Sequence, residues 1–183
     1  ILDFKLIILA KKYTMSSNII LTNQEIEHKI KRIAYQIYET FVDEEEVVIA
    51  GIASNGFVFA KKIASALSSI STLKVSICEV KVNKQNPQDA IQTSLSSEEY
   101  TNKGLVLVDD VLFSGRTIRA ALDAIGELGR PKSVQLAVLV DRGHRELPIR
   151  ADFVGKNIPT SISESVKVHL REYDNEDLVE LIK

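Results

Sequence analysis

Short apolar runs alternate along this chain with segments whose apolar residues recur at the spacing of a helix. Three runs are dominated by apolar residues, which is typical of strands buried on both faces of a sheet, at residues 47–52, 105–108 and 134–140. Residues 75–82 instead alternate between apolar and polar side chains. The helical stripes fall within residues 26–41, 60–67 and 118–128. This alternation predicts an α/β protein with a mainly parallel sheet flanked by helices, which binds ligands beyond the carboxyl ends of its strands.

Capping residues mark the boundaries of two of these helices. Thr22 followed by Glu25 has the pattern of a capping box and predicts a helix start. Gly129 and Pro131 predict the end of the helix that precedes them.

One compact domain accounts for most of the 183 residues, and we assign it to residues 15–183. Residues 1–14 precede the only methionine, Met15, and we interpret them as an extension that forms no part of a site. A genuine extra strand is the alternative.

Composition narrows the classes of function. A single cysteine, Cys78, excludes an internal disulfide framework and suits a reducing cytoplasm. The three histidines lie far apart in sequence, so a zinc cluster is not expected. The apolar residues 6–10 are too few to span a membrane. The net charge of −2 argues against general attraction to polyanions, although a local basic face stays possible.

Residues 83–104 lose the apolar period and collect Asn, Gln, Pro, Asp and Ser. A polar segment of about twenty residues inside a compact domain is usually functional or disordered. We expect it to act as a lid that closes over a site and excludes water.

The segment from 105 to 117 has the pattern of a ligand site. Four apolar strand residues lead directly into Asp109 and Asp110, and a Ser114-Gly115-Arg116-Thr117 turn then opens a helix. Paired carboxylates can accept hydrogen bonds from the two hydroxyls of a ribose. Backbone N–H groups at a helix N-terminus favour a phosphate, and Gly115 permits its close approach. One strand–turn–helix unit can therefore hold a phosphorylated pentose.

Two other interpretations of this segment compete with a ligand site. The alternative without function is a capped helix after a strand, with the two acids serving only as surface groups. Neither a G-x-x-x-x-G-K-[ST] loop nor a G-x-G-x-x-G motif after a strand is present, which disfavours the common nucleotide-binding motifs.

The segment resembles the phosphoribosyl pyrophosphate (PRPP) signature of type I phosphoribosyltransferases. Residues 136–161 extend the likeness to the family of bifunctional pyrimidine operon attenuation regulator/uracil phosphoribosyltransferases, and most of residues 18–183 share it. The resemblance implies a Rossmann-like fold with a small hood and a flexible lid loop, and self-association as dimers or larger assemblies. It also implies the conversion of uracil and PRPP to UMP and pyrophosphate, with Mg²⁺ bound through PRPP and by no dedicated protein ligands.

The resemblance further implies a role for each part of the site. Asp109 and Asp110 would hold the ribose hydroxyls, and uracil would lie near Val140, Asp141 and Arg142. The 5′-phosphate would bind at Val111, Leu112, Phe113, Ser114, Gly115, Arg116 and Thr117. The pyrophosphate loop would be Ala53, Ser54, Asn55 and Gly56.

The pyrophosphate loop departs from the family pattern. The family carries Thr-Arg-Gly where this chain reads Ser54-Asn55-Gly56, so a charge-assisted contact to the diphosphate is lost. The polar lid segment is also shorter and lacks an arginine-bearing acidic stretch. Lys81, Lys84 or Lys103 is a candidate substitute, but lysine cannot reproduce the bidentate geometry of arginine.

RNA binding is the alternative function that the resemblance raises, because relatives bind messenger RNA when a uridine nucleotide occupies the site. His28, Arg32 and Tyr35 fall at helical spacing on one exposed side. The full set of RNA-binding candidates is His28, Lys31, Arg32, Tyr35, His144, Arg145, Arg150 and Lys156. Three hypotheses therefore stay open: an enzyme that makes a nucleotide, a nucleotide-sensing regulator that binds leader mRNA, and an inert interaction domain.

Overall fold

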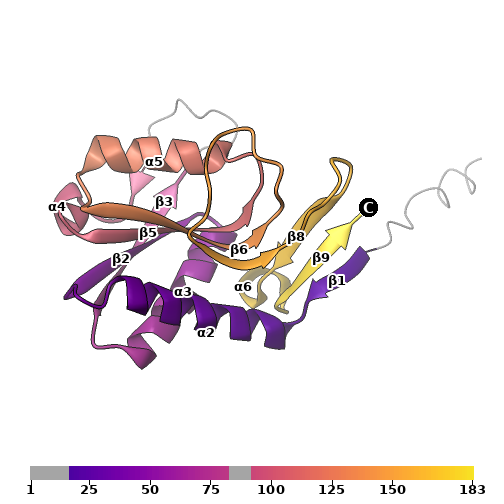
Figure 1. The fold of residues 1–183 in the computed structure, drawn as a ribbon, viewed down its shortest axis with the longest axis horizontal. Helices are drawn as coiled ribbons and strands as arrows, with labels where there is room; N and C mark the ends of the chain where they lie inside the picture. The colour runs from indigo at the N-terminus through magenta and orange to yellow at the C-terminus, as the bar shows by residue number, and fades with distance from the viewer. Residues whose placement is uncertain (1–16, 83–91) are drawn as a thin grey trace, which may run out of the picture.

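The computed structural model describes residues 17–82 and 92–183, and its main element is a six-stranded sheet in the order β4-β3-β2-β5-β6-β7 (Figure 1). Five strands are parallel, and only β4 runs antiparallel to its neighbour β3. The strands are β2 (Glu46–Ile52), β3 (Lys74–Lys81), β4 (Gln92–Thr93), β5 (Gly104–Leu112), β6 (Ser133–Asp141) and β7 (Phe153–Asn157). The predicted parallel sheet is confirmed.

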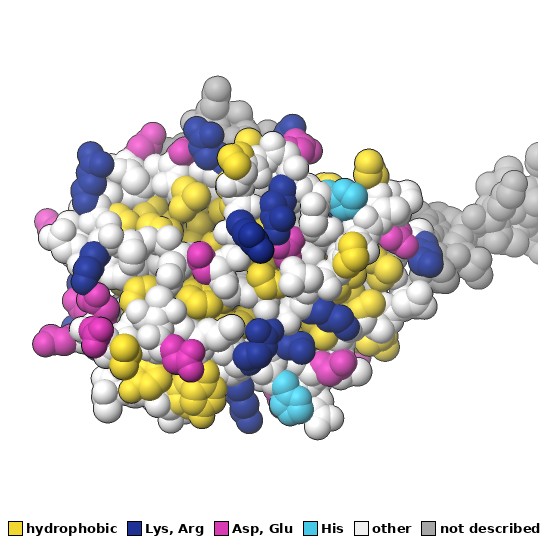
Figure 2. Space-filling view, viewed as in Figure 1, with side chains coloured by type: hydrophobic (Ala, Val, Ile, Leu, Met, Phe, Trp, Pro, Cys, Tyr) yellow, Lys and Arg dark blue, Asp and Glu magenta, His cyan; other side chains and the backbone are white. Residues whose placement is uncertain are grey.

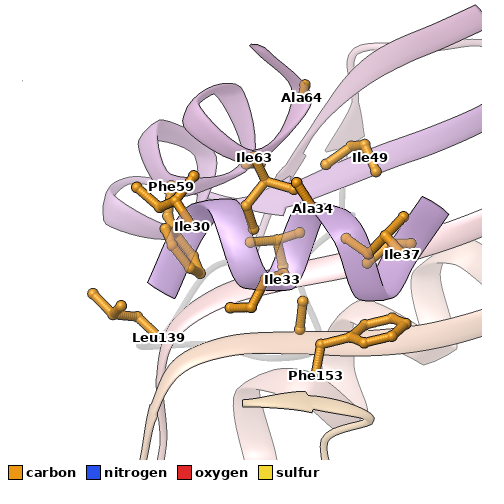
Figure 3. Close-up of a cluster of buried hydrophobic side chains, with 14 of the residues drawn as sticks. Ile30, Ile33, Ala34, Ile37, Ile49, Phe59, Ile63, Ala64, Leu139 and Phe153 are labelled. Atoms are coloured by element: carbon orange, nitrogen blue, oxygen red, sulfur yellow. The ribbon is translucent and has the colours of Figure 1, made fainter. Parts of the chain in front are cut away.

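Helices cover both faces of this sheet. Helices α2 (Asn23–Thr40) and α3 (Asn55–Ile70) lie on one face, and α5 (Arg116–Leu128) lies on the other (Figure 1). On the first face, five apolar residues of α2 pack with side chains of α3 and the strands, and Figure 3 labels four of them. On the second face, Ile118, Ala121 and Ile125 of α5 pack with Leu105 and Leu107 of β5. Strand β5 contributes side chains to the hydrophobic core on each side of the sheet. It is therefore buried on both faces, as its unbroken apolar run predicted.

Helix α2 begins where the sequence predicted. The Thr22 hydroxyl accepts the Glu25 backbone N–H, and the Glu25 carboxylate accepts the Thr22 backbone N–H, which completes the capping box. These bonds lower the pKa of the exposed Glu25 carboxyl, because they favour its charged form. The apolar residues at helical spacing are all buried: Ile26, Ile30, Ile33, Ala34 and Ile37.

A second sheet forms the expected hood. It joins β1 (Ser17–Leu21), β9 (Leu178–Ile182) and β8 (Ser165–His169) in that order, all antiparallel. The short helix α6 (Arg171–Asp174) lies between β8 and β9. Lys62 of α3 fastens the hood to the main domain, since its ammonium lies 3.2 Å from both the Glu172 and Asp177 carboxylates.

The polar segment between β3 and β5 contains regular structure that its missing apolar period did not predict. Residues 83–91, the first part of the expected lid, lie outside the described residues, as does the proposed extension of residues 1–14. The remainder forms β4 and the short helix α4 (Ser97–Tyr100), and Tyr100 is buried against Gly129. Sequence patterns missed this because the packing partner of Tyr100 follows α5, far along the chain.

The described part of the chain contains no helix that is both long enough and apolar enough to cross a membrane.

Candidate active site

The site lies where β2 and β5 separate. The two strands pair in parallel only as far as Gly51 and Val108. On its other side β5 continues to pair with β6 as far as Leu112 and Asp141. The chain leaves β2 toward α3 on one face and leaves β5 toward α5 on the other, so this is the topological switch point where open α/β sheets bind ligands.

Strand β5 is longer than the apolar run that predicted it. Asp109 and Asp110 lie within its last residues, and Val111 and Leu112 continue the ladder with β6. The Leu112 side chain is buried in the core on the α5 face. The structure therefore leaves residues 113–115 as the turn before α5, and the two preceding residues hold this turn against the sheet.

The turn before α5 has the geometry of an anion site. Gly115 has a φ of 87°, a left-handed conformation that suits glycine, and it is the N-cap of α5. The Ser114 carbonyl accepts the backbone N–H groups of Glu146 and Leu147, at 3.0 and 3.3 Å. Arg116 forms an ion pair with Glu146. The loop after β6 is thereby fastened to the turn, which presents the first N–H groups of α5 and their positive dipole end.

Both carboxylates of the acid pair are held by hydrogen bonds. Asp109 is buried, and its Oδ1 accepts the Asp110 backbone N–H at 3.0 Å. Asp110 is half-buried; its Oδ1 accepts the Val111 N–H at 2.9 Å, and its Oδ2 accepts the Asn55 amide at 3.1 Å. Gly56 lies directly behind Asp109, because a Cβ there would be 3.0 Å from Asp109 Oδ1. Two acids fixed in this way are organised for a vicinal diol.

The loop after β2 joins the site from the other side of the switch point. Its Ala53 N–H donates to the Val80 carbonyl at 3.0 Å, and the Ala53–Ser54 peptide bond is cis. Helix α3 begins at Asn55. The Asn55 amide also donates to the Val168 carbonyl of the hood, at 3.0 Å. The predicted pyrophosphate loop therefore lies beside the acid pair and beneath the hood.

The residues expected near the base lie at the end of β6, and their polar groups bond within the protein. Val140 and Asp141 end the strand and are buried. The Arg142 N–H donates to the Leu112 carbonyl at 3.0 Å, and its Nε donates to Thr160 Oγ1 at 3.1 Å. Burial lowers the pKa of the Arg142 guanidinium, although it stays charged at neutral pH. This group therefore shapes the pocket.

Phe113 provides an apolar surface beside these residues. Its ring is 40% exposed, and the Arg142 guanidinium lies 4.3 Å from the ring centroid. The His144 ring meets it edge-on at 6.2 Å. An exposed aromatic ring backed by a buried cation, next to the phosphate turn, is suited to contact a flat base.

The RNA-binding candidates do not gather into one patch. A groove of about 610 Å³ is lined by Arg32, Arg145 and Arg150, whereas Lys31 and Tyr35 line a separate groove of about 830 Å³ between α2 and α3. The helical spacing had placed Arg32 and Tyr35 on one side. Arg32 instead reaches the carbonyls of Val154 and Gly155 on β7, at 2.7 and 2.8 Å, because that strand edge supplies acceptors.

The remaining RNA-binding candidates differ in whether their side chains already bond within the protein. Lys156 donates to the Ile20 carbonyl at 2.9 Å, and His144 bonds to the Thr160 carbonyl. Arg145 forms an ion pair with Asp141. Arg150 and His28 are exposed. Figure 2 shows dark blue Lys and Arg side chains gathered over the region between α2 and the loop that follows β6.

Two of the three candidate lysines for the pyrophosphate can be placed. Lys103 pairs with Glu46 at 3.0 Å, at the first residue of β2, so it lies at the opposite end of the sheet from the site. Lys81 ends β3 and is on the site's side of the sheet. Lys84 lies outside the described residues.

The comparison with protein families decides the class. A phosphoribosyl transferase domain model matches residues 16–172. The chain belongs to the phosphoribosyltransferase family. Within that family, the "Bifunctional protein PyrR" of Leuconostoc mesenteroides is 44% identical over 174 residues, which cover 92% of this chain and 99% of the relative. The "Bifunctional protein PyrR" of Chloroflexus aurantiacus is 46% identical and covers 90% of this chain and 94% of the relative.

Solved phosphoribosyltransferases share the fold. A mutant hypoxanthine phosphoribosyltransferase of Trypanosoma cruzi, complexed with IMP, has a TM-score of 0.76 at 20% identity over 94% of this chain and 87% of its own. A hypoxanthine-guanine phosphoribosyltransferase of Bacillus anthracis has a TM-score of 0.70 at 22% identity over 91% of this chain and 98% of its own. The predicted fold and family are therefore confirmed, and the candidate site of this phosphoribosyltransferase lies where β2 and β5 separate.

Sequence reasoning missed two groups beside the candidate site and one ion pair of the hood. The Val168 carbonyl meets Asn55, the Thr160 hydroxyl meets Arg142, and Lys62 holds the hood. Each belongs to a contact between distant segments, and neither periodicity nor a local motif signals such a contact.

Proposed function

We propose that this chain transfers the phosphoribosyl group of PRPP to uracil, giving UMP and pyrophosphate. The observation that carries the proposal is the arrangement of Asp109 and Asp110 beside the Gly115 turn at the switch point. The ribose hydroxyls donate to the two carboxylates, and the 5′-phosphate accepts N–H groups at the start of α5.

The reaction needs charge stabilisation more than a nucleophile. Breaking the bond at C1 of the ribose builds positive charge on the sugar and negative charge on the departing pyrophosphate. The Asp109 and Asp110 carboxylates lie on the sugar's side of that charge separation, and fixed groups of this kind lower the barrier without reorganising. The electron pair leaves with pyrophosphate, and the ring nitrogen of uracil supplies the new bond and loses a proton.

Mg²⁺ suits this donor set. Among the described residues no group of three or more His, Cys, Asp or Glu side chains can hold a metal ion, so a cage made of protein alone is not available there. Mg²⁺ prefers phosphate oxygens and water, and it would neutralise the diphosphate of PRPP. Asp109 and Asp110 would hold such an ion only indirectly, through the ribose hydroxyls and water.

The comparison with relatives favours uracil over a purine as the base. The relatives that are 44–46% identical over about nine tenths of the chain are named PyrR, whereas the purine enzymes share only the fold. The base would lie against the ring of Phe113, near Val140 and Asp141, and it would be recognised largely through backbone groups.

A transfer assay tests substrate and activity together. With Mg²⁺ and PRPP, we expect nucleotide formation from uracil and little from hypoxanthine, guanine or orotate. Nucleotide formation from a purine instead would reject uracil as the substrate. No turnover with any base would reject the enzyme and favour a chain that only binds nucleotide.

We also propose that the chain regulates pyrimidine genes by binding leader mRNA when UMP is bound. The groove lined by Arg32, Arg145 and Arg150 supports this, because it adjoins the base site through Asp141. The Asp141 carboxylate accepts the Gly143 N–H at 2.9 Å and pairs with Arg145. A base in the pocket and a polyanion in the groove would thus both contact the loop that follows β6.

RNA binding is tested with a charge reversal at the groove. Replacing Arg145 and Arg150 with glutamate is expected to abolish UMP-dependent binding of a leader hairpin in a filter-binding assay, because two phosphate contacts become repulsive. Arg119→Glu on the outer side of α5, where Arg119 pairs with Asp123, is the matched control and is expected to bind normally. Undiminished binding by the double variant would remove this groove from the RNA interface.

Three further proposals concern the setting of the protein. We propose residues 15–183 as the functional unit, a cytoplasmic location, and self-association of identical chains. The lone Cys78 is buried, which suits a reducing compartment. Light scattering of the purified chain tests the oligomeric state.

A further inference from the structure

Asn55 occupies an unusual position between three parts of the protein. It is the first residue of α3, it follows the loop after β2, and its side chain meets both the acid pair and the hood. A primary amide has two N–H donors. One donates to Asp110 Oδ2 at 3.1 Å, and the other partner is the Val168 carbonyl at 3.0 Å.

The first of these bonds restrains the Asp110 carboxylate, and the second anchors the Asn55 side chain to the hood. Asp110 Oδ1 already accepts the Val111 N–H, so the Asn55 amide restrains the second oxygen and thereby the rotation of the group. Asp110 is half-buried, and a hydrogen bond to a charged acceptor is among the stronger ones. Asn55 therefore orients the carboxylate that we propose to bind ribose.

The same bonds leave the loop poor in donors for a diphosphate. Residues 51–56 contain no Lys or Arg, and both amide donors of Asn55 are directed to protein acceptors. A diphosphate at C1 of the ribose would face this loop, whereas the 5′-phosphate binds at the Gly115 turn on the other side of the switch point. A nucleoside monophosphate has no diphosphate at C1, so it needs no donors from this loop.

We infer that Asn55 is a positioning residue for Asp110 and that it makes this site favour a nucleoside 5′-monophosphate over PRPP. This inference rests on the proposed function, because it assumes that the ribose lies on the acid pair. The site would then be held mainly in a nucleotide-bound state, as a sensor requires.

Calorimetric titration of the full chain with Mg²⁺ and either UMP or PRPP is the test. We expect the unaltered chain to bind UMP about tenfold more tightly than PRPP, which corresponds to about 1.4 kcal/mol. Asn55→Asp keeps the size of the side chain but sets a second carboxylate against Asp110, so both ligands should weaken by about tenfold or more. Asn55→Arg adds a charged donor to the loop and should reduce the preference for UMP about tenfold.

Lys62→Met is the matched control, because it loosens the hood without touching the acid pair. It should lower the melting temperature and leave both affinities unchanged. If it instead reproduces the losses of Asn55→Asp, Asn55 acts only by holding the hood, and the inference is wrong. Unaltered UMP affinity in Asn55→Asp, or an unaltered preference in Asn55→Arg, also overturns it.

Two outcomes separate this inference from the proposal beneath it. Failure of the unaltered chain to bind either ligand refutes the proposed function and the inference with it. Binding of both ligands without any dependence on residue 55 refutes the inference alone. If Asn55→Asp does not fold, Asn55→Ala removes the same donors without adding charge and is expected to weaken UMP as well.

Discussion

Replacing Gly56 with alanine tests whether the acid pair must be held from behind. A Cβ at this position would lie 2.9 Å from the Val108 carbonyl oxygen, 3.0 Å from Asp109 Oδ1 and 3.1 Å from Asp109 Cα. Two of these three neighbours are backbone atoms of a buried strand, so they yield only if β5 and α3 move apart. The Asp109 carboxylate must therefore shift by a few tenths of an ångström.

The expected size of the effect follows from that displacement. Overpacking costs about 1–3 kcal/mol, and better helix propensity returns up to about 1 kcal/mol, so the net loss lies within about 0–3 kcal/mol and centres on about 1–2 kcal/mol. At about 2–4 °C per kcal/mol for a chain of this size, the melting temperature should fall by about 2–8 °C. A misplacement of about 1 Å can cost about a hundredfold in rate, so half of that displacement should lower kcat/KM about tenfold.

Gly126→Ala is the matched control, because nothing lies within 4 Å of a Cβ on this exposed residue of α5. It should raise stability by about 0.5–1 kcal/mol and leave activity unchanged. Circular dichroism melting and the initial rate of UMP formation measure the two effects. If Gly56→Ala matches this control in both, the close contact behind Asp109 has no functional role.

Three further predictions concern the site, the first helix and the buried thiol. Replacing Asp109 and Asp110 with asparagine should lower the rate of phosphoribosyl transfer by at least about a hundredfold and leave the circular dichroism spectrum unchanged. The control variant Asp123→Asn, on the surface of α5, should transfer normally. Equal turnover by the two variants would refute the ribose role. Thr22→Ala should cost about 1 kcal/mol in urea denaturation because it removes the cap of α2, and an unchanged midpoint would show that the cap is dispensable. Burial raises the pKa of the Cys78 thiol, so iodoacetamide at about pH 8 should alkylate the native chain far more slowly than the urea-unfolded chain. The stability that this neutral thiol contributes is present below the unfolded-state pKa and is lost as pH rises through the folded-state pKa, so denaturation midpoints that do not fall above about pH 9 would contradict it.

Local sequence determined the elements and the centre of the site. The apolar period of α2, its capping box and the unbroken run of β5 all depend on residues a few positions apart. The same is true of Asp109, Asp110 and the Gly115 turn, which follow one another on a single strand–turn–helix unit. Such features are readable because neighbours in sequence are also neighbours in space.

Only the tertiary structure decided which distant groups meet. Asn55 bonds to Val168 across 113 positions, Lys62 to Asp177 across 115, and Arg32 to Val154 across 122. No periodicity encodes these pairs, because each depends on how α2, α3 and the hood pack on the finished sheet. The same packing placed Arg32 and Tyr35 in separate grooves and ordered the segment around Tyr100. Local sequence patterns cannot predict such contacts, because the free energy of each contact depends on the fold that brings its partners together.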